Sequence, residues 1–436
     1  MNIVFVFSDQ HRACTTSIEG ADVRTPHLER MAAEGVVCRN AISNIPVCTP
    51  WRAAFLTGQY PLTNGIFLND LTLRTDRPTL GTCLRDAGYR TGYIGKWHLD
   101  GNRRAAFTPP GPRRQGWDYW AALNCTHRYS DSRYYLNDDD TPRTWEGYDA
   151  IAQTDLALDF IRGSVAEDQP FALVLSWGPP HNPYRDVPDE YLAEYPSDDI
   201  EVRPNCPDPD RQDLSGYYAH VTALDEQLGR IQDSLEQEGL MDDTIFVYTS
   251  DHGDMVGSQG EQRKQKPWDE SVRVPFVIRF PGQVQGGTSL SKPINVVDLM
   301  PTLLGLCGIP TPETVEGRDL GPLLRGEEPD GDGTALTMCI TPFAEYTGLP
   351  WRGVRTSRYT YARRLDGPWL LYDNDSDPHQ MNNLIDDVAH RSLRDALEDQ
   401  LQQLLAERGD PFEPAAYYIE QGGFEVDEKG AVSYSN

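Results

Sequence analysis

Short apolar runs rich in β-branched and aromatic residues recur along this chain of 436 residues, with helical patterns between them. Ile3–Phe7, Phe171–Trp177 and Thr244–Thr249 are almost continuously apolar, as in strands that a parallel sheet buries on both faces. The segments 149–162 and 214–237 show the spacing of amphipathic helices. This order predicts an α/β fold in which helices flank a large, mostly parallel sheet.

A stretch rich in Pro, Gly and Glu, residues 310–333, separates this pattern from a different one. We therefore expect two domains, a larger one at residues 1–333 and a smaller one at 334–436. In the smaller domain, Asp366-Gly367-Pro368 is a hairpin signature between two apolar runs, and residues 389–408 have a helical pattern. We expect an α+β domain with an antiparallel sheet and one helix.

Polar side chains follow four of the predicted strands. Because an open parallel sheet binds ligands outside the carboxyl ends of its strands, we expect these side chains to converge. Each has an ordinary structural interpretation when taken singly: a turn residue, a solvated charge, a loop histidine or a helix cap. Their recurrence at one edge of the sheet favours a site. The residues are Asp9 and Gln10, Lys96 and His98, His181, and Asp251 and His252.

The oxygens among these side chains come from Asp9, Gln10 and Asp251, and His252 adds a nitrogen. Oxygen donors suit a Ca²⁺-like cation, and the nitrogen keeps Mn²⁺ open. Facing them we expect a cationic wall that suits a tetrahedral oxyanion. It would consist of Lys96, His98, His181 and Lys264.

The stretch from Cys48 to Gly58 is predicted to form a short helix. Thr49 suits the N-cap, Pro50 the first helical position and Gly58 the left-handed residue after the last turn. Cys48 would then lie just outside the helix N-terminus, where backbone N–H groups and Arg52 favour an anion. A small buried cysteine before an ordinary helix is the alternative interpretation.

The net charge of -28 disfavours binding to nucleic acid or to an anionic membrane, so an anionic substrate needs a local cationic pocket. Eight cysteines without a CxxC pair indicate reduced thiols rather than a disulfide framework. No apolar run is long enough to span a bilayer. Met1 leads into the first strand without a signal-peptide pattern, which predicts a cytoplasmic protein, although a removed signal stays open.

Together these segments resemble the type I, formylglycine-dependent sulfatases of the alkaline phosphatase superfamily, and the likeness covers most of the chain. The family signature Cys-x-Pro-x-Arg matches at Cys48, Pro50 and Arg52, with Thr57-Gly58 after it. Further motifs match as Gly-Lys-Trp-His at 95–98, Pro-Pro-His at 179–181, Ser-Asp-His-Gly at 250–253 and Lys-x-x-Pro from Lys264. The likeness implies an alkaline phosphatase-like catalytic domain at 1–333.

The resemblance also implies that a maturation enzyme converts Cys48 to formylglycine, whose hydrate binds the metal and attacks sulfur. Arg52 would hold the attacking oxygen, and Lys96 would bridge it to the sulfate oxygens. His181, assisted by Lys264, would protonate the departing alcohol. His98 would remove the proton from the second hydroxyl of the hydrate, so that sulfate leaves.

One motif departs from the family pattern, because Gln10 stands where many sulfatases have a second aspartate. The pair Asp9-Gln10 is similar to the phosphonate monoester hydrolases and related phosphodiesterases of the same superfamily, and that activity is the alternative. Those relatives lack Gly-Lys-Trp-His, so Lys96 and His98 favour sulfate. A catalytically silent binding protein is disfavoured, because no expected catalytic position is substituted.

A long segment rich in Pro, Gly, Arg, Asp and Tyr, about residues 102–148, is expected to be an irregular insertion that lines the substrate site. Polar and aromatic side chains together suit a small sulfated carbohydrate, and packing within ordinary loops is the alternative. The candidates are Asn69, His127, Arg128, Trp145 and, from the smaller domain, Arg352. Whether the protein forms a homo-oligomer stays open.

Overall fold

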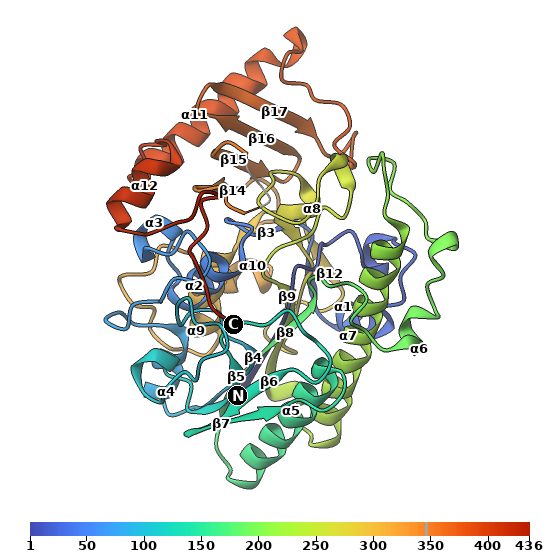
Figure 1. Cartoon of the computed structure of the whole chain (residues 1–436), viewed down its shortest axis with the longest axis vertical. Coiled ribbons are helices and arrows are strands. Elements are labelled where there is room, and N and C mark those ends of the chain that lie inside the picture. The colour runs from blue at the N-terminus through green and yellow to red at the C-terminus, as the bar shows by residue number, and fades with distance from the viewer. Residues whose placement is uncertain (345–347) are drawn as a thin grey trace.

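The computed structural model describes residues 1–344 and 348–436. A ten-stranded sheet forms its centre, in the order β12-β2-β11-β9-β1-β8-β4-β5-β6-β7 (Figure 1). The middle of the sheet is parallel: β1 (Asn2–Asp9) lies between β8 (Phe171–Pro180) and β9 (Thr244–Ser250), and β4 (Arg90–Lys96) follows β8. The predicted α/β fold is therefore confirmed.

Further strands, joined partly by antiparallel pairs, extend the sheet at both edges. On one side are β11 (Phe276–Arg279), β2 (Val36–Cys38) and β12 (Thr288–Leu290), and on the other β5 (Tyr119–Leu123), β6 (Arg133–Leu136) and β7 (Asp139–Thr144). β5 to β7 lie within the segment 102–148, so the expectation of an irregular insertion is wrong for those residues. β7 is an almost fully exposed edge strand, which needs no alternation of apolar residues, so the sequence pattern does not reveal it.

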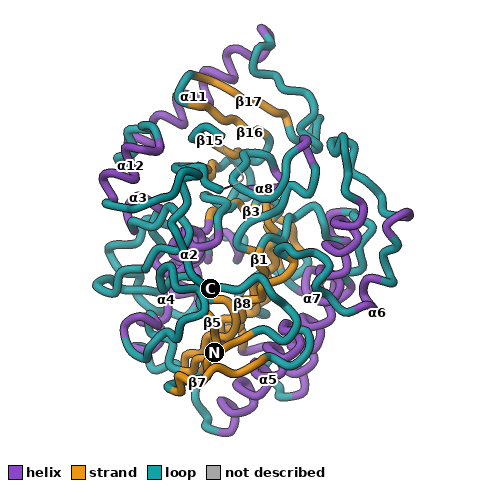
Figure 2. Tube along the Cα trace, viewed as in Figure 1, coloured by secondary structure: helices purple, strands orange, loops and turns teal. Residues whose placement is uncertain are grey.

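Helices cover both faces of the sheet (Figure 2). Successive residues of β1 point to opposite sides, so Phe5 and Phe7 join one core and Val4 and Val6 join the other. The hydrophobic core that contains Phe5 and Phe7 also includes residues of α2 (Cys48–Thr57), α4 (Leu80–Asp86) and α9 (Leu299–Leu306). The other core includes residues of α1 (Pro26–Glu34), α5 (Asp149–Ala166) and α7 (Arg211–Gln237).

Short elements complete the larger part of the chain. A three-stranded sheet contains β10 (Arg273–Val274), β3 (Ala41–Ile42) and β13 (Ile294–Asn295). The short helices are α3 (Pro61–Asn64), α6 (Asp189–Leu192), α8 (Asp269–Val272) and α10 (Gly321–Leu324). Single 3-10 turns cover Ser17–Glu19, Pro112–Arg114, Ser197–Asp199, Met241–Asp243, Ser258–Gly260, Val296–Asp298 and Val388–His390.

A second, antiparallel sheet lies at the far end of the molecule (Figure 1). It consists of β14 (Thr334–Cys339), β15 (Trp351–Thr356), β16 (Tyr359–Arg364) and β17 (Gly367–Asp373), packed against α11 (Arg391–Glu407) and followed by α12 (Ala415–Gly422). β16 and β17 form the expected hairpin. The division at residues 333 and 334 falls just before β14 and stays a prediction.

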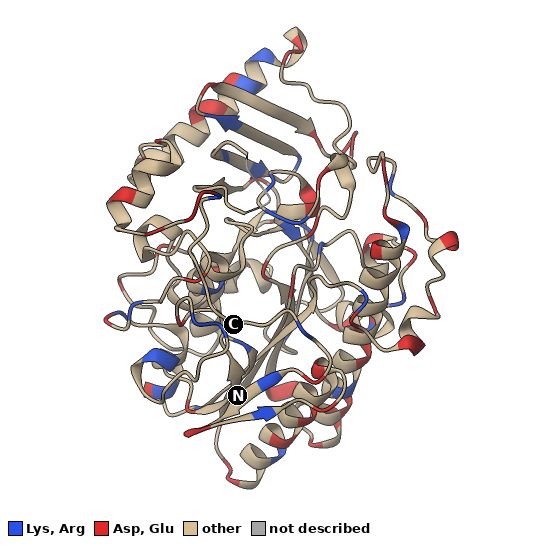
Figure 3. Cartoon of the chain, viewed as in Figure 1, with Lys and Arg blue, Asp and Glu red and all other residues tan. Residues whose placement is uncertain are grey.

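Asp and Glu residues are scattered over helices and loops alike (Figure 3). All eight cysteines carry free thiols, as the absence of a CxxC pair predicts. Within residues 1–344 and 348–436, no helix combines the length and apolar character needed to cross a membrane.

Candidate active site

The carboxyl ends of four strands of the large sheet meet beside the N-terminus of α2. β1 ends at Asp9, β4 ends at Lys96, and His181 and Asp251 directly follow β8 and β9. All four side chains are buried. The structure thus brings together the residues that the strand-end pattern predicts to converge.

The helix that carries Cys48 starts two residues earlier than expected. Cys48 is the first residue of α2, and Val47 occupies the cap position without a side-chain cap. The Thr49 hydroxyl instead accepts a hydrogen bond from Asp70 N at 3.3 Å, so its expected capping role is wrong. Gly58 has the expected left-handed backbone, with φ 62°.

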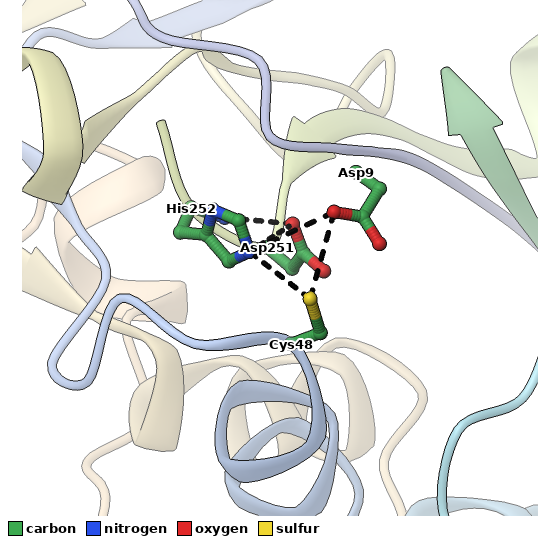
Figure 4. A group of neighbouring side chains, drawn as sticks. All are labelled: Asp9, Cys48, Asp251 and His252. Atoms are coloured by element: carbon green, nitrogen blue, oxygen red, sulfur yellow. Dashed lines mark hydrogen bonds and ion pairs between the residues drawn. The ribbon is translucent and has the colours of Figure 1, made fainter. Parts of the chain in front are cut away.

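Three donor groups gather around Cys48 (Figure 4). Asp9, Cys48, Asp251 and His252 each offer one ligand atom, and these atoms lie within 4.8 Å of one another. The thiol sulfur lies 3.3 Å from His252 Nε2 and 3.7 Å from Asp9 Oδ1. Such a cluster of oxygen donors with one imidazole suits a divalent cation.

Gln10 adds an unpaired oxygen beside this cluster. Its Nε2 donates to Asp254 Oδ2 at 2.6 Å, and its backbone N–H donates to Asp251 Oδ1 at 3.0 Å. Gln10 Oε1 is buried and has no hydrogen-bond partner among the described residues. A buried amide oxygen without a partner is costly, and a bound cation would satisfy it. The predicted ligands therefore fit a metal.

The two carboxylates of the cluster have opposite pKa shifts. Burial alone would raise the pKa of Asp9, but Lys96, 2.6 Å from Asp9 Oδ2, and the other nearby cations hold that pKa well below its usual value. Burial and the charge of Asp9 raise the pKa of Asp251. Because two buried carboxylates repel each other, a cation between them would favour the ionised form of both.

Arg52, a residue of α2, binds both carboxylates of the donor cluster. Its Nη2 lies 3.3 Å from Asp9 Oδ2 and 3.2 Å from Asp251 Oδ2. Its Nη1 donates to the Lys96 carbonyl at 2.6 Å and to Ser176 Oγ at 2.7 Å. The guanidinium is buried and joins three of the four strand ends. Its contacts orient both carboxylates of the donor cluster.

The Cys48 thiol lies in a cationic environment. Lys264 Nζ is 2.9 Å from the sulfur. Burial and the charge of Asp9 would raise the pKa of Cys48, but Lys264, Lys96 and His252 outweigh them and hold the pKa well below its usual value. The surroundings of the Cys48 side chain therefore stabilise a negative charge on residue 48.

His181 is held as a neutral imidazole next to the same lysine. Its Nδ1 lies 2.8 Å from the Asn182 carbonyl, so Nδ1 carries the proton and Nε2 accepts from Lys264 Nζ at 3.2 Å. Burial, Lys264 and His127 lower the pKa of His181. His127 stacks on His181 with ring centroids 4.3 Å apart. Lys264 and His181 thus form a connected proton-donating pair.

His98 is supported by two residues that the sequence motifs do not indicate. Asp70 Oδ1 lies 3.2 Å from His98 Nε2, and Arg104 binds both Asp70 oxygens at 2.8 and 2.7 Å. Burial lowers the pKa of His98, yet Cys125 and the Asp70 hydrogen bond raise it to about 10. The protonated form of His98 is therefore strongly stabilised. Asp70 and Arg104 belong to loops without a motif, so only the tertiary contact identifies them.

A cavity of about 320 Å³ opens onto these residues. Asn69, His127, His181 and Lys264 line it, and we call it the catalytic cavity. Asn69 Oδ1 also accepts from Thr49 N at 3.0 Å, which ties the cavity wall to the start of α2. Of the predicted substrate-binding residues, Asn69 and His127 lie in this cavity.

A second cavity of about 630 Å³ adjoins it and is lined by Arg128, Arg133 and Thr126. Both cavities share Arg104, His127 and Tyr434. Arg128 therefore lies next to the catalytic cavity rather than in it. The side chains of Arg128 and Arg133 are exposed, and they give this cavity a cationic lining in a protein of strong negative charge.

Two predicted substrate-binding residues lie outside these cavities. Arg352 is fully buried: its Nε lies 2.5 Å from Asp410 Oδ2, and its guanidinium packs over the Phe412 ring. The structure corrects the expectation for Arg352, because these contacts leave no surface for a substrate. Trp145 is 3% exposed and stacks on Tyr134 at 3.7 Å, so it packs the insertion instead of lining either cavity.

Comparisons with known proteins agree with this geometry. The sulfatase family model matches residues 1–309, and the model of the N-sulphoglucosamine sulphohydrolase C-terminal region matches residues 257–407. An ulvan-active sulfatase of Formosa agariphila is 42% identical over 99% of this chain and 86% of its own length. An endo-4-O-sulfatase of Bacteroides thetaiotaomicron is 30% identical over 94% of this chain and 93% of its own. The solved structure of yidJ from Bacteroides fragilis superposes with a TM-score of 0.86 and 32% identity, covering 96% of this chain and 97% of that one.

Proposed function

The chain belongs to the sulfatase family and is a sulfuric ester hydrolase, and we propose that it hydrolyses sulfate esters of carbohydrates through a formylglycine made from Cys48. The observation that carries the mechanism is the position of the Cys48 sulfur. It lies among the donor atoms of Asp9, Asp251 and His252, and 2.9 Å from Lys264 Nζ. An oxygen nucleophile at this position would touch the metal ligands and a cation at once.

A divalent cation would be held by Asp9, Gln10, Asp251 and His252. Most of these donors are oxygens, so we propose Ca²⁺, with Mn²⁺ as the alternative because of the imidazole. When bound, the cation supplies positive charge to an oxygen on residue 48 and to the sulfate. Arg52 fixes the two carboxylates, so the ligand set is already oriented.

Residue 48 would be the nucleophile after a maturation enzyme has converted Cys48 to formylglycine. A thiolate that attacked sulfur would form an S–S linked adduct without an easy exit. The aldehyde hydrate offers two hydroxyls on one carbon, one to attack sulfur and one to release sulfate as the carbonyl re-forms.

The remaining residues would move protons and stabilise charge. Lys96, held by Asp9, faces the sulfate oxygens and favours the charge that develops there. The Lys264–His181 pair protonates the departing alcohol. In its neutral form, His98 accepts the proton of the second hydroxyl, and Asp70 stabilises the imidazolium that results.

Two observations support a carbohydrate as the organic part of the substrate. The relatives described above are named for ulvan and for endo-4-O-sulfatase activity. In addition, the second cavity carries Arg128 and Arg133 directly beside the catalytic cavity. Such a lining suits a polyanionic sugar chain and exceeds what a simple aryl sulfate requires.

Gln10 supports the second candidate, a phosphonate monoester or phosphodiester hydrolase. Lys96 and His98 oppose it, because they belong to the Gly-Lys-Trp-His motif, which the phosphonate monoester hydrolases and related phosphodiesterases lack. The ratio of kcat/KM values on 4-nitrophenyl sulfate and on a matched phosphate or phosphonate ester decides between the two.

The decisive experiment measures sulfate release by the matured enzyme from a carbohydrate panel. The panel contains ulvan oligosaccharides and sulfated amino sugars, together with 4-nitrophenyl sulfate as a simple aryl ester. We expect release from at least one carbohydrate and none by Cys48→Ala on any substrate. Turnover of the aryl ester alone would contradict a carbohydrate substrate, and unchanged turnover by Cys48→Ala would contradict the mechanism.

A further inference from the structure

The segment after α12 returns from the second sheet to the active site. In Figure 1 it runs in dark red from α12 to the C-terminus, which is marked close to β4. We call residues 423–436 the return segment. Ser435 N donates to the Asn102 carbonyl at 3.0 Å, and the Ser435 carbonyl accepts from Arg104 N at 2.8 Å. These backbone hydrogen bonds fix the segment on the loop that follows β4.

Within the return segment, Tyr434 packs on Arg104. The guanidinium carbon of Arg104 lies 3.4 Å from the Tyr434 ring centroid. Arg104 is itself only 8% exposed and is held by its two bonds to Asp70. Tyr434 is 50% exposed. The arginine thus holds the tyrosine ring in place while half of its surface stays accessible.

Tyr434 also stands at the junction of the two cavities. It lines the catalytic cavity together with His181 and Lys264, and the second cavity together with Arg128 and Arg133. A carbohydrate with its sulfate in the catalytic cavity and its next sugar in the second cavity would therefore pass the Tyr434 ring. An accessible, immobilised aromatic ring at this place can pack against the apolar face of a sugar.

We propose that Tyr434 is a specificity-determining residue, whose ring binds the sugar joined to the sulfated one. The proposal rests on the proposed carbohydrate sulfatase function and adds the binding position for the second sugar. Through Tyr434, the return segment then forms part of the substrate-binding site. The enzyme then favours oligosaccharides over monosaccharides that carry the same sulfate ester.

The test compares Tyr434→Ala and Tyr434→Leu with the unchanged protein and with Tyr434→Phe. Substrates are 4-nitrophenyl sulfate, a sulfated monosaccharide of the panel, and an oligosaccharide that ends in the same sulfated sugar. We expect KM for the oligosaccharide to rise about five- to tenfold in the Ala and Leu variants, with kcat unchanged. Tyr434→Phe should retain the original KM. The two small substrates should be unaffected.

Tyr417→Ala is the matched control, because Tyr417 is a comparably exposed tyrosine of α12 at 42% and lines neither cavity. An unchanged oligosaccharide KM in Tyr434→Ala and Tyr434→Leu overturns the inference. An equal loss of kcat on all three substrates also overturns it, because Tyr434 would then act through Arg104 and Asp70. If the unchanged protein cleaves 4-nitrophenyl sulfate but no carbohydrate, the proposed function itself fails, and the inference fails with it.

Discussion

Lys264 Nζ lies 2.9 Å from Cys48 Sγ, and both side chains are buried. This ammonium group stabilises whichever anion residue 48 carries. We expect mass spectrometry of the Cys48 peptide, from cells with a maturation system, to show the lower mass of the aldehyde form. A fully intact thiol in active enzyme would contradict the proposed nucleophile.

Asp70→Asn is expected to lower kcat about 100-fold with little change in KM. Its carboxylate stabilises the protonated form of His98, and an amide of the same shape cannot supply that charge. Steady-state kinetics on a carbohydrate sulfate measures the effect. Asp76→Asn, at an exposed aspartate, is the control. Equal kcat values for the two variants would remove Asp70 from the mechanism.

His181→Ala should affect substrates according to their leaving groups. A sugar alkoxide is a poor leaving group and needs a proton, so we expect a loss of about 100-fold or more in kcat on carbohydrate sulfates. The loss on 4-nitrophenyl sulfate should be much smaller, because nitrophenolate leaves without a proton. His390→Ala, at a partly exposed histidine that lines neither cavity, should change neither rate. Equal losses on both substrates would exclude His181 as part of the acid.

Removal of metal should destabilise the protein. A cation that binds only the folded state at 100 times its Kd adds about 2.7 kcal/mol to the free energy of unfolding. We therefore expect Ca²⁺ to raise the thermal midpoint of chelator-treated protein, with Mn²⁺ tested in parallel. Asp251→Asn should abolish the shift, and Asp22→Asn, at an exposed aspartate, should retain it. A full shift in Asp251→Asn would place the cation elsewhere.

Arg352→Ala should lower stability rather than substrate affinity. Removal of one partner from a buried ion pair costs about 3–5 kcal/mol, and Asp410 would be left without its partner. Urea unfolding measures this change. Arg358→Ala breaks a more exposed pair with Asp373 and should cost at most about 1 kcal/mol. A raised KM with unchanged stability would restore Arg352 as a substrate ligand.

The sequence predicts the parts of this protein that local patterns determine. Ile3–Phe7 and Phe171–Trp177 lie in adjacent parallel strands, because a continuous apolar run is typical of a strand that a parallel sheet buries on both faces. The residues at the strand ends converge because the carboxyl ends of parallel strands lie at the same edge of the sheet.

Tertiary contacts determine the parts that the sequence does not reveal. Arg352 and Arg104 are both arginines in polar segments, yet Arg352 in β15 binds Asp410, which follows α11, and Arg104 binds Asp70 at the active site. No spacing rule distinguishes them. Tyr434 is about 330 residues away from Arg104 along the chain, so its place beside both cavities depends on the path of the return segment.

The burial of α2 bears on when the proposed conversion of Cys48 would take place. All ten residues from Cys48 to Thr57 are buried, and Cys48 itself is 1% exposed. Under the proposed mechanism, an enzyme that converts Cys48 would have to reach this side chain, and the finished fold buries it. The conversion would therefore take place on the nascent or unfolded chain. A molecule that folded first would keep its thiol, so expression faster than maturation would yield a mixed population.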